Sequence, residues 1–243
     1  MSMVEKCISQ EEMGTFSHAD ILELNTHGYE IGRFTETVKA ALCLAAYAHE
    51  GDRRKLANMP FLAHPFETML MVAEIEGIDP YDVEPGSEAE ASLVMALLHD
   101  TDEDSHGRVS VAMVEDLFGR RIAAGVELAT RDKSQTDEVY FGKISLSPDK
   151  PALRVIATDK SHALTCRIPE LYKLKADPIE KFSMSVADKV HYYIAVYNAL
   201  TPGLGRDDAT MRIFEELIVQ YAQQIEKILK IEVDLRVLTS DSV

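Results

Sequence analysis

Ionisable side chains crowd into one short stretch of this 243-residue sequence, LLHDTDEDS at positions 97–105. His99 and Asp100 directly follow two leucines there, and three further acids occupy positions 102–104. Imidazole and carboxylate groups bind divalent metal ions, and a carboxylate can also accept a proton from water. A solvated acidic turn that merely ends a helix would have the same composition, so the other residues of the chain must distinguish the two.

Two further positions place a metal-binding side chain in an apolar helical segment. His64 lies in FLAHPFE and Asp159 lies in RVIATDKSH. Taken alone, these would be a hydrogen-bonded core histidine and a salt-bridged helix residue. Together with His99 and Asp100, they form a mixed nitrogen and oxygen set that suits Mn²⁺, Fe²⁺, Co²⁺ or Zn²⁺. His64 precedes His99 by 35 residues and Asp159 follows Asp100 by 59, so three helices must converge in a bundle core.

The adjacency of His99 and Asp100 raises a geometric difficulty. Neighbouring residues on a regular α-helix point about 100° apart. Both side chains reach one ion only if it lies across the helix surface between them, or if the helix loosens at this point. The acidic stretch that follows favours the loosened helix.

Helical periodicity dominates the chain, and we predict one all-α domain. Ser17, Thr35 and Ser110 are expected N-caps, and Gly51 and Gly119 are expected stops. Only IEVDLRVL near the C-terminus could form a short strand, or else a frayed tail. The expected helical segments are 17–24, 35–50, 65–72, 89–98, 111–118, 122–130, 138–144, 151–164, 178–200 and 211–231.

The net charge of −16, from 41 acidic and 25 basic residues, repels phosphate backbones, so nucleic acid is not an expected partner. The three cysteines, Cys7, Cys43 and Cys166, have no paired spacing, which favours a reducing compartment and hence the cytoplasm. No apolar run approaches the roughly 20 residues of a membrane span, and no signal-peptide pattern is visible, so no membrane association is expected.

Five blocks of the sequence resemble, in order, those of the HD superfamily of metal-dependent phosphohydrolases. The resemblance is closest to the hydrolase domain of the Rel/Spo-type alarmone enzymes and their small stand-alone relatives, and it covers about residues 36–170. The blocks are AAYAHEGDRRKLANMPFLAHPFE, LVMALLHDTDEDS, VEDLFGRRIAAGVELATR, EVY and ALRVIATDKSH.

The resemblance implies an all-α HD-domain helical bundle with a metal site in its core. It implies one divalent ion, typically Mn²⁺, with Fe²⁺, Co²⁺, Ni²⁺, Zn²⁺ and Mg²⁺ left open. Glu103 and Asp104 match the pair that activates or delivers the attacking water. The implied metal ligands are His64, His99, Asp100 and Asp159.

The resemblance also implies residues that contact a phosphorylated substrate. Arg54 and Lys55 match the family's Arg-Lys pair, and such side chains grip phosphate oxygens. A solvated basic loop is the simpler alternative for these two. Tyr140 is a further candidate that could instead merely pack. Lys160 and His162 form, with Arg167, a weaker second cluster that could also be surface pairs.

The implied reaction is hydrolysis of guanosine 3′,5′-bis(diphosphate), in which pyrophosphate leaves the 3′ position, as in the stringent response. Ala163 stands where the alarmone hydrolases carry Asn, and Lys160 where they carry Arg. The missing Asn favours an alternative substrate, either another phosphorylated nucleotide or a phosphorylated dinucleotide cofactor. The third hypothesis is a non-catalytic sensor with the HD fold that binds a nucleotide or a metal ion.

Three segments are expected along the chain. Residues 1–33 would form an N-terminal extension with a short helix, 34–200 the HD-type hydrolase domain, and 201–243 a C-terminal helix and tail packed on it. The first and last segments could form a homodimer contact or cover the pocket. The expected partner is a small phosphorylated nucleotide.

Overall fold

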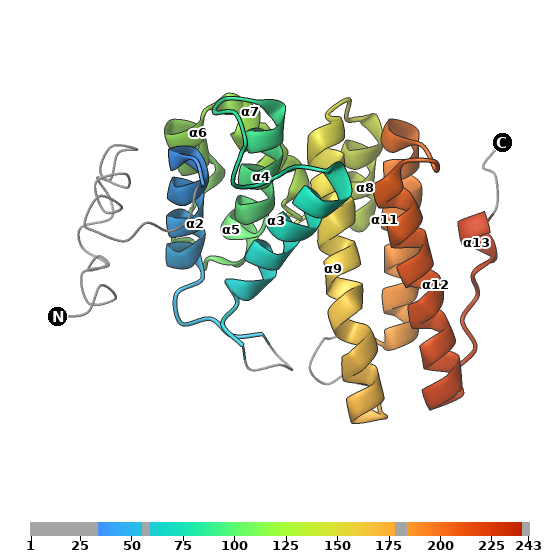
Figure 1. Cartoon of the computed structure of the whole chain (residues 1–243). Coiled ribbons are helices and arrows are strands. Elements are labelled where there is room, and N and C mark those ends of the chain that lie inside the picture. Colours follow the sequence, from blue (N-terminus) through green and yellow to red (C-terminus); the bar gives the residue numbers. More distant parts are fainter. Residues whose placement is uncertain (1–33, 55–58, 178–183, 240–243) are drawn as a thin grey trace.

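The computed structural model describes residues 34–54, 59–177 and 184–239, and its cartoon is shown in Figure 1. These residues form α-helices and no β-strand, apart from one isolated bridge between Arg53 and Pro60. The all-α prediction is therefore confirmed. The helices are α2 (Glu36–Ala48), α3 (Ala63–Glu76), α4 (Glu88–Leu98), α5 (Thr101–Asp104), α6 (Val111–Phe118), α7 (Arg120–Ala129), α8 (Asp137–Leu146), α9 (Lys150–Leu174), α11 (Val186–Leu204), α12 (Ala209–Leu229) and α13 (Arg236–Thr239).

Local capping residues set several of these boundaries. The Thr35 hydroxyl accepts a hydrogen bond from the Val38 amide at the start of α2, and Ser110 accepts one from Met113 at the start of α6. Both N-caps agree with the prediction, because a side-chain oxygen satisfies an otherwise unpaired amide. α2 ends at Ala48, before the expected stop at Gly51. The helix expected after Ser17, and Lys55, lie outside the described residues.

The segment IEVDLRVL forms neither a strand nor a frayed tail. Residues 231–235 are irregular, and α13 follows them. Val233 and Leu238 are buried in the same hydrophobic cluster as residues of α11 and α12. Because no neighbouring strand is available in the described chain, burial of these two side chains sets the local conformation rather than β-propensity.

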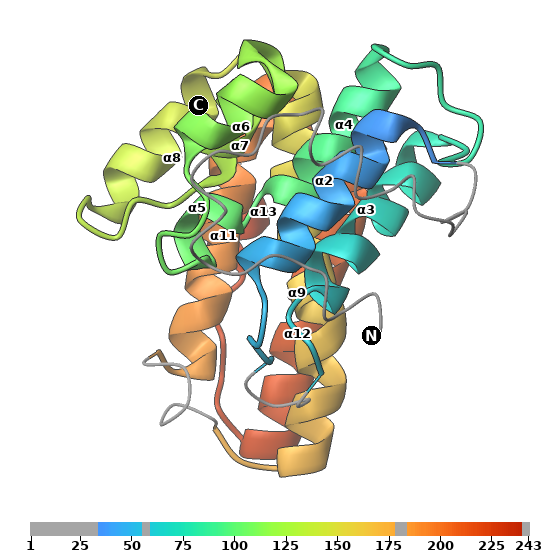
Figure 2. The same cartoon turned by 90° about the vertical axis from the view of Figure 1, so that its left-hand side faces the viewer.

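Two hydrophobic clusters meet at α9. The first is built from α2, α3, α4, α6 and α7, and the second from α8, α11, α12 and α13. α9 contributes Ala152 and Val155 to the first cluster, and Leu153 and Ile156 to the second. In Figure 1, α9 accordingly lies between the two groups of helices, and Figure 2 views the molecule from the side of the first group, with α2 in front of α9. None of the described helices is long and apolar enough to cross a membrane.

Candidate metal centre

The four side chains expected to bind metal come together from three places in the fold. His64 lies in the first turn of α3, Asp159 lies near the middle of α9, and His99 and Asp100 lie between α4 and α5. α4 ends at Leu98 and α5 begins at Thr101, so the helix is interrupted at the His-Asp pair. This interruption resolves the adjacency difficulty, because the two neighbouring side chains no longer have to follow one helical rotation.

The ligand atoms are spaced for a single ion. His64 Nε2 lies 3.3 Å from His99 Nε2, 3.3 Å from Asp100 Oδ2 and 3.0 Å from Asp159 Oδ1. His99 Nε2 lies 3.2 Å from Asp100 Oδ2 and 3.4 Å from Asp159 Oδ1. With metal–ligand bonds of about 2.1 Å, ligand atoms are separated by roughly 3.0 to 3.4 Å in octahedral and tetrahedral sites. The ligand atoms of His64, His99 and Asp100 all lie within 4.8 Å of one another, so these three residues fit a divalent ion, and Asp159 Oδ1 faces the two histidines from α9.

The electrostatics of the cluster also favour a cation. Burial opposes protonation of His64 and His99, but Asp100 and Asp159 outweigh burial and raise the pKa of both imidazoles. Burial would raise the pKa of the two carboxyls, but His99 beside Asp100 and Lys160 beside Asp159 lower it instead. Two buried carboxylates without a positive charge would be costly, so this position requires a proton or a metal ion.

Outer contacts orient three of the four candidate ligands: His99, Asp159 and His64. His99 Nδ1 donates to the Ala96 carbonyl at 2.8 Å, which leaves Nε2 as the lone-pair atom. Lys160 Nζ pairs with Asp159 Oδ2 and leaves Oδ1 facing the two histidines. Lys160, predicted to contact substrate, thus directly holds a metal-ligand candidate, and its substrate role stays a prediction.

His64 is oriented by His162, the second predicted substrate-binding residue in α9. The two Nδ1 atoms are 2.8 Å apart, and His162 Nε2 lies 2.8 Å from Glu67 Oε2. If His64 Nε2 carries a metal, its Nδ1–H donates to His162 Nδ1, and His162 Nε2–H donates to Glu67. His162 is buried behind the ligand with both nitrogens occupied, so its predicted substrate contact would require rearrangement.

Comparison with known proteins identifies the family. A family model described as HD domain matches residues 61–193, which is more than half of the chain. This chain belongs to the HD domain family. The match confirms the HD-domain resemblance. HD domains are typically metal-dependent phosphohydrolases that bind divalent ions, and the His/Asp cluster has the composition expected of such a site.

The curated relatives of this HD-domain protein are distant. It is 26% identical over 196 residues to "GTP pyrophosphokinase rsh" of Brucella ovis, and 27% identical over 139 residues to "GTP pyrophosphokinase" of Myxococcus xanthus. The alignments cover 79% and 52% of this chain, but 21% and 16% of the relatives. The chain thus spans about a fifth of these longer proteins, and the likeness to Rel/Spo-type proteins is confirmed at the family level.

Of the three acidic residues that follow His99 and Asp100, Glu103 and Asp104 are the catalytic candidates and Asp102 has a structural contact. Glu103 Oε2 accepts a hydrogen bond from the Arg131 amide at 3.0 Å, and burial followed by the Asp100 charge raises its pKa. Asp104 pairs with Lys133 at 3.0 Å and is more exposed. Asp102 does not simply face water, because it accepts a hydrogen bond from the Val111 amide at the start of α6.

Basic groups surround the cluster on the α9 and α11 side of the HD domain. Lys189 of α11 is mostly buried, and burial together with the charges of Arg167 and Lys160 lowers its pKa to about 7. Its ammonium lies 4.4 Å from the centre of the Tyr192 ring, and in the described chain it has no carboxylate partner. Sequence reasoning missed Lys189, because nothing in its local pattern links it to α9.

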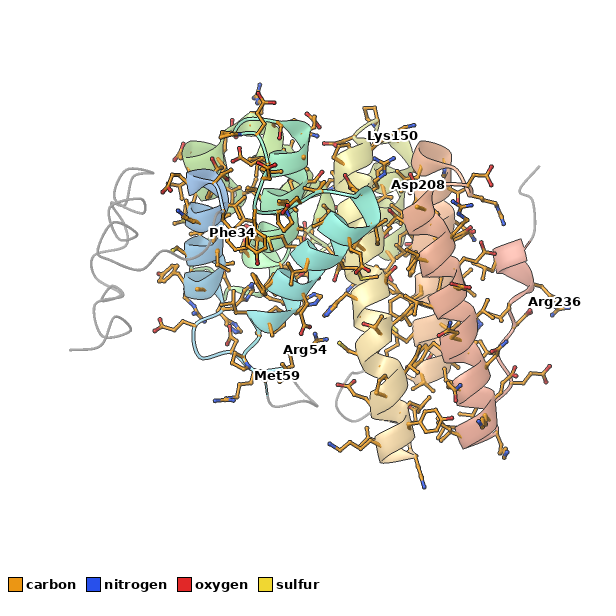
Figure 3. All side chains as sticks on the ribbon, viewed as in Figure 1. Phe34, Arg54, Met59, Lys150, Asp208 and Arg236 are labelled. Carbon is orange, nitrogen blue, oxygen red and sulfur yellow. The ribbon has the colours of Figure 1, made fainter. Side chains whose placement is uncertain are left out.

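The predicted substrate residues Arg54 and Tyr140 have different surroundings. Figure 3 shows Arg54 near the lower end of α3, on the side toward α9, and its charge acts on His162 and Cys166. Tyr140 is buried in the second hydrophobic cluster, and its hydroxyl donates to the Ala129 carbonyl at 3.2 Å. Tyr140 therefore packs in the core, which was the alternative to a substrate contact, and a substrate contact stays a prediction.

One buried histidine near the HD-domain centre was given no role from the sequence. His49, in the first of the five blocks, AAYAHEGDRRKLANMPFLAHPFE, is 3% exposed, and neither ring nitrogen has a hydrogen-bond partner among the described residues. Burial lowers its pKa, and Asp100 is the largest of the charges that act against burial. A buried imidazole without partners among the described residues, close to the candidate metal ligand Asp100, has hydrogen-bonding capacity available for water or substrate.

Proposed function

We propose that this HD-domain protein hydrolyses a phosphorylated nucleotide, and that guanosine 3′,5′-bis(diphosphate) is the substrate, with pyrophosphate released from its 3′ position. The observation that carries the proposal is the buried His64, His99, Asp100 and Asp159 cluster with Glu103 beside it. The relatives whose names describe GTP chemistry support a guanine nucleotide.

The side chains divide the work of hydrolysis. When bound, a divalent ion polarises a phosphoryl oxygen and lowers the pKa of water. Mn²⁺ is our proposal for that ion. Glu103 accepts the proton of the attacking water, because its raised pKa makes it a stronger base than an ordinary carboxylate. Asp104, paired with Lys133 at the edge of the site, assists in delivering that water.

The substrate's negative charge requires positive side chains, and this acidic chain concentrates them around α9. The Arg54 charge acts on Cys166 of α9, and the charges of Arg167 and Arg131 act on Lys189 of α11. The lowered pKa of Lys189 means that its ammonium is poorly compensated in the free protein. A phosphate group there would supply the missing negative charge. We propose that Lys55 assists Arg54 in the same task.

The test is a measurement of products with metal-reloaded protein. Metal-free protein is supplied with Mn²⁺ and guanosine 3′,5′-bis(diphosphate), and pyrophosphate and orthophosphate are measured separately, with His99→Ala as the matched blank. We expect pyrophosphate from the intact protein alone. Intact protein that holds Mn²⁺ and releases no pyrophosphate would refute the alarmone substrate.

A second substrate class is favoured by Ala163, a half-buried residue of α9 that stands where the resemblance predicts Asn. Without an amide there, the site loses donors and acceptors for a nucleobase. The alternative is therefore another phosphorylated nucleotide or a phosphorylated dinucleotide cofactor. A panel of such compounds, assayed with intact protein and with Ala163→Asn, distinguishes the two: a gain of alarmone hydrolysis in Ala163→Asn with little in the intact chain would favour the alternative.

A further inference from the structure

A second group of metal-binding side chains lies next to the first. Glu67, His162 and Cys166 each offer one ligand atom, and these atoms all lie within 4.8 Å of one another. His162 Nε2 is 2.8 Å from Glu67 Oε2 and 4.0 Å from Cys166 Sγ. Cys166 is a free thiol and partly buried, and the Glu67 side chain is about half exposed, at 47%. The group is therefore open to solvent on one side.

The periodicity of α3 and α9 explains why the second group lies next to the first. On α3, His64 and Glu67 are three residues apart, and on α9 His162 and Cys166 are four residues apart. Residues three or four apart lie on the same face of a helix, so each pair presents its side chains in one direction. α3 packs against α9, and the contact between His64 and His162 joins the two groups.

The donor types differ between the two groups. The first offers two imidazoles and two carboxylates, a set that suits harder ions such as Mn²⁺ as well as softer ones. The second contains a thiol, and a thiolate with an imidazole selects Zn²⁺ or Co²⁺ over Mn²⁺ or Mg²⁺. Zinc sites with three protein ligands and an open fourth position are common where solvent has access.

We propose that Glu67, His162 and Cys166 form a second metal site, which takes Zn²⁺ or Co²⁺ and whose occupancy weakens the ion held by His64. The ion would take the place of the hydrogen bond between His162 Nε2 and Glu67 Oε2. With bonds of about 2.0 Å to nitrogen and 2.3 Å to sulfur, the ligand atoms would be roughly 3.3 to 3.6 Å apart. The present distances of 2.8 and 4.0 Å require small adjustments in opposite directions.

The coupling between the sites follows from counting protons on the two imidazoles. With a metal on His64 Nε2, its Nδ1–H donates to His162 Nδ1 across 2.8 Å. A metal on His162 Nε2 removes that ring's N–H, so neutral His162 must carry its hydrogen on Nδ1, facing the hydrogen on His64. Two N–H groups cannot share one hydrogen bond, so the contact that orients His64 must open. Each ion is therefore expected to weaken the other.

The test uses Co²⁺ and the full chain. Metal-free protein is titrated with Co²⁺, and bound equivalents are counted while thiolate-to-cobalt charge-transfer absorption is recorded. We expect two equivalents in the intact chain and charge-transfer absorption with the second. Cys166→Ser should bind one equivalent and lose the absorption, and Cys43→Ser, a matched control in the first hydrophobic cluster, should retain both features. Glu67→Gln, which keeps the thiol, should bind the second ion more weakly.

Two outcomes would overturn the proposal. A single equivalent in the intact chain, or charge-transfer absorption that survives Cys166→Ser, would exclude this site. The coupling is tested in His99→Ala, whose first site lacks a ligand. In His99→Ala, the affinity of the thiol-containing site for Co²⁺ should be at least several-fold higher than the affinity of the intact chain for its second Co²⁺. Equal affinities would refute the coupling. Neither result depends on the substrate or on catalysis.

Discussion

At the scale of single residues, three of the four candidate ligands present one atom to the cluster and commit their other polar atom to the protein. His99 uses Nδ1 on the Ala96 carbonyl, His64 uses Nδ1 on His162, and Asp159 uses Oδ2 on Lys160. Such contacts fix the tautomer and orientation of a ligand before the metal arrives. The residues behind the ligands should therefore matter for metal binding without touching the ion.

Glu103→Gln should separate metal binding from turnover. The amide cannot accept a proton from water, so we expect about a 100-fold or larger loss of kcat with Mn²⁺ affinity nearly unchanged. Asp102→Asn is the matched control, since its side chain can still accept the Val111 amide hydrogen bond and its charge changes equally. Steady-state kinetics and Mn²⁺ binding measure both quantities; a fully active Glu103→Gln would refute its assignment as the base.

His162→Ala should weaken the metal site that it supports from behind. Loss of the partner of His64 Nδ1 is expected to reduce Mn²⁺ affinity by about 10- to 100-fold. His106→Ala is a suitable control, because His106 is 74% exposed and pairs with Asp52 at 3.6 Å. Equilibrium Mn²⁺ binding checks the prediction, and equal affinities in the two variants would show that His162 does not position His64.

At the scale of helices, the site depends on one buried helix and on the way it ends. Residues 90–98 of α4 are all buried, so the helix that carries His99 is held on every side. α4 packs against α2, α3, α7 and α9. Its interruption before α5 then aims His99 and Asp100 at the same point. We expect this packing on every side to keep His99 and Asp100 in place relative to α3 and α9.

Two helical glycines provide a matched pair for testing this packing. A Cβ on Gly125 of α7 would lie 2.0 Å from the sulfur of Met95 in α4, whereas one on Gly142 of α8 would meet nothing within 4 Å. We expect Gly125→Ala to destabilise the protein by about 1–3 kcal/mol. Gly142→Ala should stabilise it by up to about 1 kcal/mol. Denaturant unfolding measures both, and equal effects would contradict the close α4–α7 contact.

α11 contributes Lys189 to the basic side of the site. Under the proposed function, Lys189→Met should raise KM about 10-fold or more with little change in kcat, because a charge-assisted contact to phosphate contributes about 1.5–3 kcal/mol. Lys150→Met changes the same charge at the exposed start of α9, far from the ligands, and should leave KM unchanged (Figure 3). A fall in kcat alone would argue that Lys189 acts on the reacting groups instead.

At the scale of the whole molecule, the ligand cluster connects the two halves of the fold. α3 and α4 belong to the first hydrophobic cluster, while α9 is shared between the two. An ion bound to His64, His99, Asp100 and Asp159 would therefore join helices that are distant in sequence. A ligand that binds the folded state alone stabilises it, by about 2.7 kcal/mol at 100 times its Kd.

The stability of the metal-free protein should depend on pH in a direction set by the histidines. His64 and His99 have a folded-state pKa above the ordinary 6.5. Their contribution to the stability of the folded state is therefore complete below pH 6.5 and is lost as pH rises through the folded-state pKa. Asp100 and Asp159 have a lowered pKa, so their contribution is lost in acid. We expect the Tm of metal-free protein to fall as pH rises above 6.5.

The increase in Tm that Mn²⁺ causes should change with pH in the opposite direction. Protons compete with the ion for the two imidazoles, so the increase in Tm caused by Mn²⁺ should grow as pH rises over the same range. Thermal unfolding with and without Mn²⁺ at a series of pH values measures both trends. A metal-induced increase in Tm that shrinks toward high pH would show that the two histidines do not hold the ion.

The sequence by itself determined the helical fold, several helix starts and the identity of the candidate ligands. Thr35 and Ser110 could be predicted as caps because capping depends on residues three positions apart. The ligands could be named because few side-chain types bind metals and because their order along the chain resembles the HD family. These are local or ordered features, which a linear pattern contains.

The tertiary structure alone decided what surrounds those ligands. Lys189 beside Lys160, the contact of His162 with His64, and the unpartnered His49 each depend on helices brought together from distant positions. The same is true of IEVDLRVL, for which the sequence left a short strand or a frayed tail open, and whose conformation is decided by burial of Val233 and Leu238 with residues of α11 and α12. Burial, charge coupling and tautomer are properties of neighbours in space, and no spacing along the chain specifies them.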